Sequence, residues 1–199
     1  MKKILLLIVS ILFLGCNKDD NPARGNEGFN SLYGGIPYKG TIRGSISLEG
    51  DKLDLSGDGT IALIEETKDS VSVVFLADID DLGEINIKIR GRIDRESFYM
   101  EKENSEIFFR ITDNAINGKF FSEVQEMTFD GNLSRETAHM KMTAIFKQAT
   151  DSFPKGTRLE LDFDSSRKVT ENDDGTGCQM RMVPIWGPNG MTMGMVPDC

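Results

Sequence analysis

The sequence predicts an all-β domain built as an antiparallel up-and-down meander, and three observations carry that prediction. Between residues 38 and 163 apolar side chains repeat at every second position, as in strands with one dry and one wet face. Glycine, aspartate, asparagine and serine interrupt these runs at short intervals, as turns require. No segment between the runs has the spacing of an amphipathic helix. We expect closure into a barrel, because it removes exposed edge strands, although a two-sheet sandwich fits the same alternation.

Each expected strand is marked by apolar residues at alternating positions. These residues are, in chain order, Ile42, Ile46 and Leu48; Leu53 and Leu55; the apolar members of residues 60–65; Val71, Val73 and Phe75; Ile85, Ile87 and Ile89; Phe98 and Met100; Ile107, Phe109 and Ile111; Ile116 and Phe120; Met127, Phe129 and Leu133; Met140, Met142, Ala144 and Phe146; and Leu159, Leu161 and Phe163. About ten short strands joined by short turns are typical of a meander in which sequential strands pair.

The first residues are typical of a secretory signal. Lys2 and Lys3 precede an apolar stretch over residues 4–14, which is short for a transmembrane helix and ends at Gly15 and Cys16. A small residue followed by cysteine resembles the lipobox, at which lipoprotein signal peptidase cuts and leaves a diacylated cysteine. The resemblance implies a lipid on Cys16, which anchors the protein in a membrane without a transmembrane helix. The alternative is an ordinary secreted protein with a free Cys16.

Three polar residues after the lipobox bear on the destination of the protein. Lys18, Asp19 and Asp20 resemble the lysine-acidic-acidic signal that sends some lipoproteins of Gram-negative bacteria to the cell surface. The alternative is a solvated polar tether. We expect a lipid anchor in the outer membrane and exposure on the cell surface. The expected organisation is a signal peptide over residues 1–15, a lipidated tether and linker over 16–36, a barrel domain over 37–165, and a C-terminal extension over 166–199.

Several short segments resemble the calycin-like, lipocalin-type domains of bacterial surface lipoproteins. They are a strand that begins Tyr38-Lys39-Gly40-Thr41, the Gly-Asp-Gly-Thr segment at residues 57–60, and a late pair at residues 129–133 and 138–144. The resemblance covers about residues 38–150. It implies a calycin-like barrel, and it implies that such a barrel holds a small apolar ligand.

The sequence contains no recognisable catalytic set. His139 is the single histidine, and the alternation around it turns its side chain to solvent. There is no Gly-x-Ser-x-Gly elbow and no phosphate-cradling loop. The acidic residues Asp78, Asp80 and Asp81 lack the glycine and terminal glutamate of a calcium-binding loop, which favours an ordinary turn. We expect no enzymatic activity and no cofactor, and the net charge of −9 argues against nucleic acid as a partner.

The C-terminal segment is expected to form a hairpin. The chain between Cys178 and Cys199 folds back on itself about a loop at residues 187–190, which places Met182 opposite Met195 and the two cysteines opposite each other. With Cys16 carrying the lipid, Cys178 and Cys199 are the remaining thiols, so an oxidising compartment would join them in a disulfide. Two prolines predict that the hairpin lies at an edge of the sheet.

One face of this hairpin gathers soft side chains, namely Met180, Met182, Trp186, Met191, Met193 and Met195. Two interpretations are open. The side chains pack against the barrel or bind a partner, since methionine adapts to varied surfaces. Alternatively, the thioethers form a soft site for copper(I) or silver(I).

The leading functional hypothesis is a membrane-anchored, non-enzymatic barrel that binds a small apolar ligand or a surface protein partner. One alternative is the handling of copper(I) or silver(I) by the methionine and tryptophan face. Another is a purely structural or adhesion module, in which Phe75, Phe109, Phe129 and Phe146 fill the barrel.

Overall fold

The computed structural model describes residues 28–67, 69–168, 179–187 and 190–198. Its elements are α1 (Phe29–Tyr33), β1 (Tyr38–Leu48), β2 (Asp51–Thr67), β3 (Ser70–Ile79), β4 (Gly83–Asp94), β5 (Ser97–Met100), β6 (Ile107–Thr112), β7 (Ala115–Phe121), β8 (Gln125–Leu133), β9 (Thr137–Phe146), β10 (Arg158–Ser166), β11 (Gln179–Gly187) and β12 (Gly190–Asp198). Cys16, Lys18, Asp19, Asp20, Cys178 and Cys199 lie outside the described residues.

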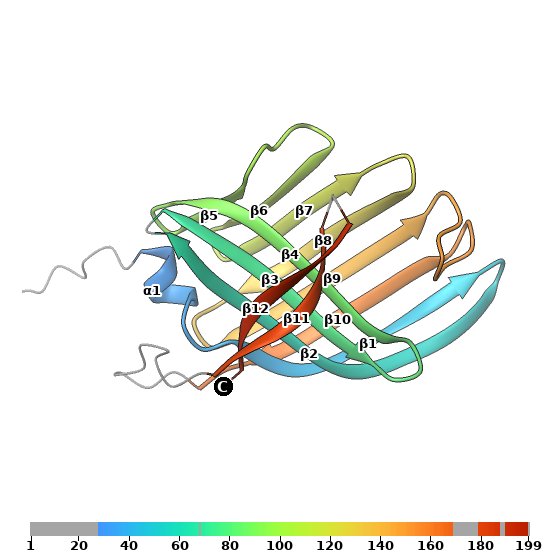
Figure 1. Cartoon of the computed structure of the whole chain (residues 1–199), viewed down its shortest axis with the longest axis horizontal. Helices are drawn as coiled ribbons and strands as arrows, with labels where there is room; N and C mark the ends of the chain where they lie inside the picture. The colour runs from blue at the N-terminus through green and yellow to red at the C-terminus, as the bar shows by residue number, and fades with distance from the viewer. Residues whose placement is uncertain (1–27, 68, 169–178, 188–189, 199) are drawn as a thin grey trace, which may run out of the picture.

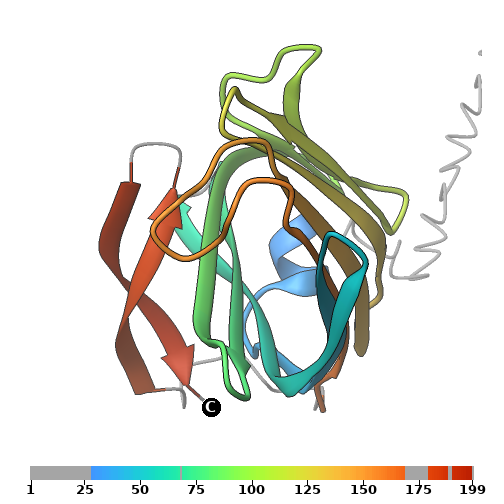
Figure 2. The same ribbon diagram turned by 90° about the vertical axis from the view of Figure 1, so that its right-hand side faces the viewer.

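Strands β1 to β10 form a closed antiparallel barrel. Each strand pairs with the next along the chain, and β1 pairs with β10, so the ring has no open edge between its first and last strands. Figure 1 shows the strands wrapping around a common interior, and Figure 2 looks at the ring from one end. The predicted up-and-down meander is confirmed, and the barrel rather than the sandwich is the correct closure.

Aromatic side chains fill the middle of the barrel. The Phe75 ring lies 5.8 Å from each of the rings of Phe109 and Phe129 and 6.2 Å from that of Phe163, measured between ring centres. These four side chains come from four strands and are nearly inaccessible to solvent. Such contacts add edge-to-face and stacked ring interactions to ordinary apolar burial. The interior at this level is therefore a packed core.

The barrel closes tightly where β4 meets β5. Gly91 of β4 pairs with Met100 of β5, and the Phe98 ring lies directly over Gly91. A Cβ atom at position 91 would come within 2.3 Å of Phe98 Cζ and 2.4 Å of the Tyr99 carbonyl oxygen. Glycine is therefore the residue that lets the two backbones approach.

One end of the barrel is plugged by α1. This helix lies within residues 16–36, which the sequence suggested as a tether, yet its Phe29 and Tyr33 side chains are buried. The Phe29 ring stacks on Phe98 at 5.9 Å and contacts the Tyr33 ring at 4.9 Å. The amide of Phe29 also donates to the carbonyl of Arg95 in the turn between β4 and β5. Among the described residues, no helix is long and apolar enough to cross a membrane.

The hairpin β11–β12 lies outside the ring as a second layer (Figures 1 and 2). A single parallel pair, Trp186 with Ile87, joins β11 to β4, and the Asn86 side-chain amide donates to the Pro184 carbonyl at 2.6 Å. Val183 and Val196 turn toward the barrel and are buried. They form a small apolar cluster with outward-facing residues of β2 and β3, namely Ala62, Val74 and Leu76. The hairpin therefore shields an apolar patch of the outer wall from solvent.

Candidate functional site

The two ends of the barrel differ. The turns that follow β2, β4, β6 and β8 lie at the same end as α1, whereas the turns that follow β1, β3, β5 and β7 lie at the opposite end with the β9–β10 loop. We call the end with α1 the closed end and the opposite end the mouth. Figure 1 shows α1 at the left and the mouth at the right.

Arg167 holds the closed end together. Its side chain is almost completely buried, and its guanidinium donates hydrogen bonds of 2.6–3.0 Å to five main-chain carbonyls, those of Leu32, Tyr33, Gly34, Ile36 and Arg135. These contacts join the segment before β1 to the segment after β10 and to the β8–β9 turn. A buried guanidinium with so many fixed acceptors acts as a structural clamp.

Tyr38 belongs to the same cluster. Its hydroxyl donates to the Ser134 carbonyl at 2.7 Å, and its ring lies under the Arg167 guanidinium. Burial raises the pKa of Tyr38 far above its ordinary value, against a smaller lowering by the positive charge of Arg167. The phenol therefore stays neutral at any physiological pH and serves as a hydrogen-bond donor.

A pocket of about 330 Å³ opens at the mouth. This mouth pocket is lined by Ile46, Ser47, Leu48, Asp51, Lys52, Leu53, Leu82, Ser152, Phe153, Pro154 and Thr157. The lining is mostly apolar and comes from the β1–β2 hairpin, the β3–β4 turn and the β9–β10 loop. Its volume is at the lower limit of ordinary small-molecule sites.

Leu53 and Phe153 give the mouth pocket its apolar character. Alternation in the sequence grouped Leu53 with the inward residues, but its side chain is 60% exposed because it lies near the tip of the β1–β2 hairpin. The Phe153 ring packs on Phe146 at 4.5 Å between ring centres, which attaches the β9–β10 loop to the barrel. The pocket therefore has one fixed wall and one apolar rim residue open to solvent.

Among the residues that line this pocket, Thr157 has a buried hydroxyl group without a hydrogen-bond partner. Its side chain is 1% exposed, and its hydroxyl oxygen has no hydrogen-bond partner among the described residues. Leaving such a group unpaired costs about 1–3 kcal/mol. The hydroxyl oxygen has almost no accessible surface of its own, so it is closed off from the pocket.

The acidic residues on the outer wall do not form a metal centre in the described part of the chain. Asp80 accepts a hydrogen bond from the Ser56 hydroxyl at 2.8 Å, and Asp81 adopts the left-handed backbone conformation of a turn residue. No group of three or more His, Cys, Asp or Glu side chains in the described ranges is arranged to hold a metal ion.

His139 lies on the outer wall, as predicted. Strand alternation turns Ala138, Met140 and Met142 into the barrel, where all three are buried. The His139 imidazole points the other way and is half exposed. The Nδ1 atom lies 3.1 Å from a carboxylate oxygen of Asp164 on the adjacent strand. This is a surface pair on the convex side of the barrel, away from the mouth pocket.

The methionine face of the hairpin has the predicted register but not the predicted packing. Met182 pairs with Met195, Pro184 with Met193, and Trp186 with Met191. The packing interpretation is wrong for the three methionines whose side chains are described, because Met182, Met193 and Met195 are 64%, 62% and 51% exposed. Alternate residues on the opposite face, Val183 and Val196, make the contact with the barrel. The side chains of Met180, Trp186 and Met191 lie outside the described part.

No family model matches the sequence, and a comparison with curated proteins gives no match. The antiparallel barrel that the calycin-like resemblance implied is present. The family assignment itself stays a prediction.

Sequence reasoning missed the mouth pocket. Six of its eleven lining residues belong to β1 and β2, where alternation marked Ile46, Leu48 and Leu53 as inward residues. The other five come from the β3–β4 turn and the β9–β10 loop, and no alternation shows that these segments come together with the hairpin. A further signal was Phe153-Pro154, an aromatic residue and a proline in an otherwise polar loop.

Proposed function

We propose that the protein is an exported, lipid-anchored binding protein without enzymatic activity, which holds a small apolar molecule at the mouth of its barrel. The observation that carries this proposal is the mostly apolar lining of the mouth pocket. A concave site with such a lining is typical of small-molecule binding.

The filled core limits where a ligand can lie. Phe75, Phe109 and Phe129 occupy the middle of the barrel, and α1 plugs the closed end. A ligand that enters the barrel therefore reaches no further than the mouth, where Leu53 and Phe153 would contact its apolar part. This position favours a compact molecule, or one end of a longer one, over a ligand enclosed by the barrel.

The attachment of the protein to its surroundings belongs to the same proposal. We propose that Cys16 carries the lipid in the outer membrane, that Lys18, Asp19 and Asp20 direct the protein to the cell surface, and that Cys178 and Cys199 form a disulfide. The disulfide is supported by the pairing of Gln179 with Asp198, since these residues adjoin the two cysteines and lie opposite each other. Outside the cytoplasm, where the environment is oxidising, two thiols at opposite positions are expected to form a disulfide.

The test compares two variants of the rim. Binding of decanoic acid is measured by displacement of the fluorescent probe 1-anilinonaphthalene-8-sulfonate, and native mass spectrometry of the purified protein looks for a carried molecule. Leu53→Asp places a charge in the mouth pocket at an exposed position, so we expect at least about tenfold weaker binding without loss of folding.

Val124→Asp is the matched control. Val124 is 41% exposed and follows β7 at the same end of the barrel, but it does not line the pocket. Its variant should bind like the unchanged protein. Equal effects of both variants would overturn the proposal. So would a protein that binds neither decanoic acid nor the fluorescent probe and whose native mass shows no carried molecule. Either result would favour the purely structural or adhesion role.

A further inference from the structure

We propose that Met182, Met193 and Met195 form a binding site for a soft monovalent cation, copper(I) or silver(I), on the outer face of the hairpin. This site is separate from the mouth pocket and does not depend on the ligand proposed there. The cation is bound and released without any change in its oxidation state.

The backbone register brings the three thioethers together. Met182 of β11 and Met195 of β12 are direct cross-strand partners, so their Cβ atoms lie about 4.5–5.5 Å apart. Met193 lies two residues before Met195 on the same strand and hence on the same face, diagonal to Met182. Each side chain has three rotatable bonds, which lets the sulfur atoms converge without backbone movement.

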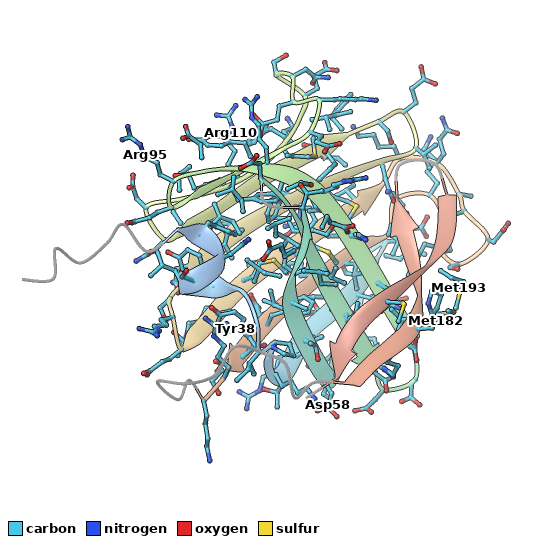
Figure 3. The ribbon with its side chains drawn as sticks, turned by 60° about the vertical axis from the view of Figure 1, so that its left-hand side comes forward. Tyr38, Asp58, Arg95, Arg110, Met182 and Met193 are labelled. Carbon is cyan, nitrogen blue, oxygen red and sulfur yellow. The ribbon has the colours of Figure 1, made fainter. Side chains whose placement is uncertain are left out.

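The three side chains have no packing role toward the barrel. Val183 and Val196 already make the contact with the outer wall, and the methionines project away from it. Figure 3 shows the labelled Met182 and Met193 on the side of the hairpin that faces away from the barrel. The solvent face of an antiparallel pair ordinarily carries polar side chains, so three exposed methionines at adjoining positions call for a chemical reason.

Thioether chemistry selects the ion. Methionine sulfur is a soft, neutral ligand that needs no deprotonation, and it favours copper(I) and silver(I) over harder ions such as calcium, magnesium and zinc. No set of carboxylate, imidazole or thiolate ligands competes within the described residues, because none of these groups is clustered there. Binding should therefore be nearly independent of pH between about 5 and 8, where thioethers do not titrate.

The experiment uses silver(I), which needs no reductant and so leaves any disulfide intact. The full-length protein is extracted in detergent, its free thiols are blocked with iodoacetamide, and its methionine methyl groups are labelled with ¹³C. We expect one silver ion per chain and shifted methyl signals for Met182, Met193 and Met195. Methyl signals of the buried Met140 and Met142 should not move.

Substitution by leucine separates metal binding from apolar docking, because leucine keeps the volume and apolar character of methionine but removes the sulfur. The triple variant M182L/M193L/M195L should bind silver(I) at least about 100-fold more weakly. The matched control M100L/M127L replaces two half-buried methionines of the barrel and should bind like the unchanged protein. Absence of stoichiometric silver binding, or unchanged affinity in the triple variant, would overturn the proposal.

Discussion

The guanidinium carbon of Arg167 lies 4.4 Å from the centre of the Tyr38 ring. Tyr38 opens β1, and Arg167 directly follows β10, so this contact lies where the first and last strands of the ring meet. It combines a cation–π interaction with the five carbonyl hydrogen bonds of the same guanidinium. At the closed end, one side chain therefore contacts the segment before β1, the first residue of β1 and the β8–β9 turn.

Replacing Arg167 by lysine should destabilise the protein. An ammonium group has three donors without the planar geometry of the guanidinium, so it cannot satisfy the five carbonyls that Arg167 reaches. We expect the free energy of unfolding to fall by about 2–4 kcal/mol, measured by urea denaturation. The control is Arg158→Lys, at an exposed residue that pairs with Glu160, where the change should be below about 0.5 kcal/mol. Equal losses in the free energy of unfolding at both positions would show that Arg167 contributes no more to stability than an exposed arginine does.

Gly91→Ala should disturb the closure of the barrel. The added methyl group would meet the Phe98 ring and the Tyr99 carbonyl, and a carbonyl cannot move without breaking the β4–β5 pairing. We expect a loss of about 1–3 kcal/mol in thermal or chemical unfolding. Gly28→Ala, where no atom lies within 4 Å of the new methyl group, should leave stability nearly unchanged.

Val196→Asp should release the hairpin while the barrel stays folded. The charge would be buried against Ala62 and Leu76, whereas the barrel has a separate core that does not involve the hairpin. Hydrogen exchange should quicken at least about tenfold in β11 and β12 and stay unchanged in β8 and β9. Met195→Ser, on the exposed face of the same strand, should have no such effect. Faster exchange throughout the barrel of the Val196 variant would contradict an independent outer layer.

Glu66→Gln should lower stability in a pH-dependent manner. The Glu66 carboxylate accepts hydrogen bonds from Lys88 and Ser72 at 2.7 Å, and these contacts lower its pKa below the ordinary 4.5. A lowered pKa in the folded state means that the stabilisation is present above pH 4.5 and is lost as the pH falls through the lowered value. We expect a cost of about 0.5–1 kcal/mol at pH 7, reduced by solvent screening. The two proteins should have equal stability near pH 2, and a difference that persists there would contradict this account.

Thr157→Val should raise stability without weakening binding. Valine has nearly the shape of threonine but no hydroxyl, so it removes a buried group that lacks a partner in the free protein. We expect the free energy of unfolding to rise by about 1 kcal/mol, and we expect decanoic acid to bind as it does to the unchanged protein, because the hydroxyl oxygen is closed off from the pocket. A fall in stability would mean that the hydroxyl is already satisfied in the free protein.

Much of the fold could be predicted because strand alternation follows directly from burial. In β9, for example, Ala138, Met140 and Met142 face inward and His139 faces outward, as the sequence indicated. The hairpin register also followed from the sequence, since the pairing of Met182 with Met195 depends only on where the loop lies. Local periodicity and turn position are enough for such features.

The outer layer and the plug at the closed end could not be predicted in the same way. Val74 and Leu76 break the alternation of β3 and signal a strand buried on both faces, yet nothing in the local sequence says that Val183 and Val196 supply the covering layer. The insertion of Phe29 into the closed end was hidden for a similar reason, because a single helical turn leaves no periodic pattern. Long-range packing decided these features.

The clamp at Arg167 also determines how the protein would respond to pulling. Tension applied to the chain ahead of Phe29 reaches α1 first, and α1 is fastened to the Arg95 carbonyl and, through its last residues, to Arg167. These bonds would have to rupture before force could peel β1 away from its neighbours. Force applied from this side would thus be borne at the closed end, and the loops at the mouth would carry none of it until these bonds broke.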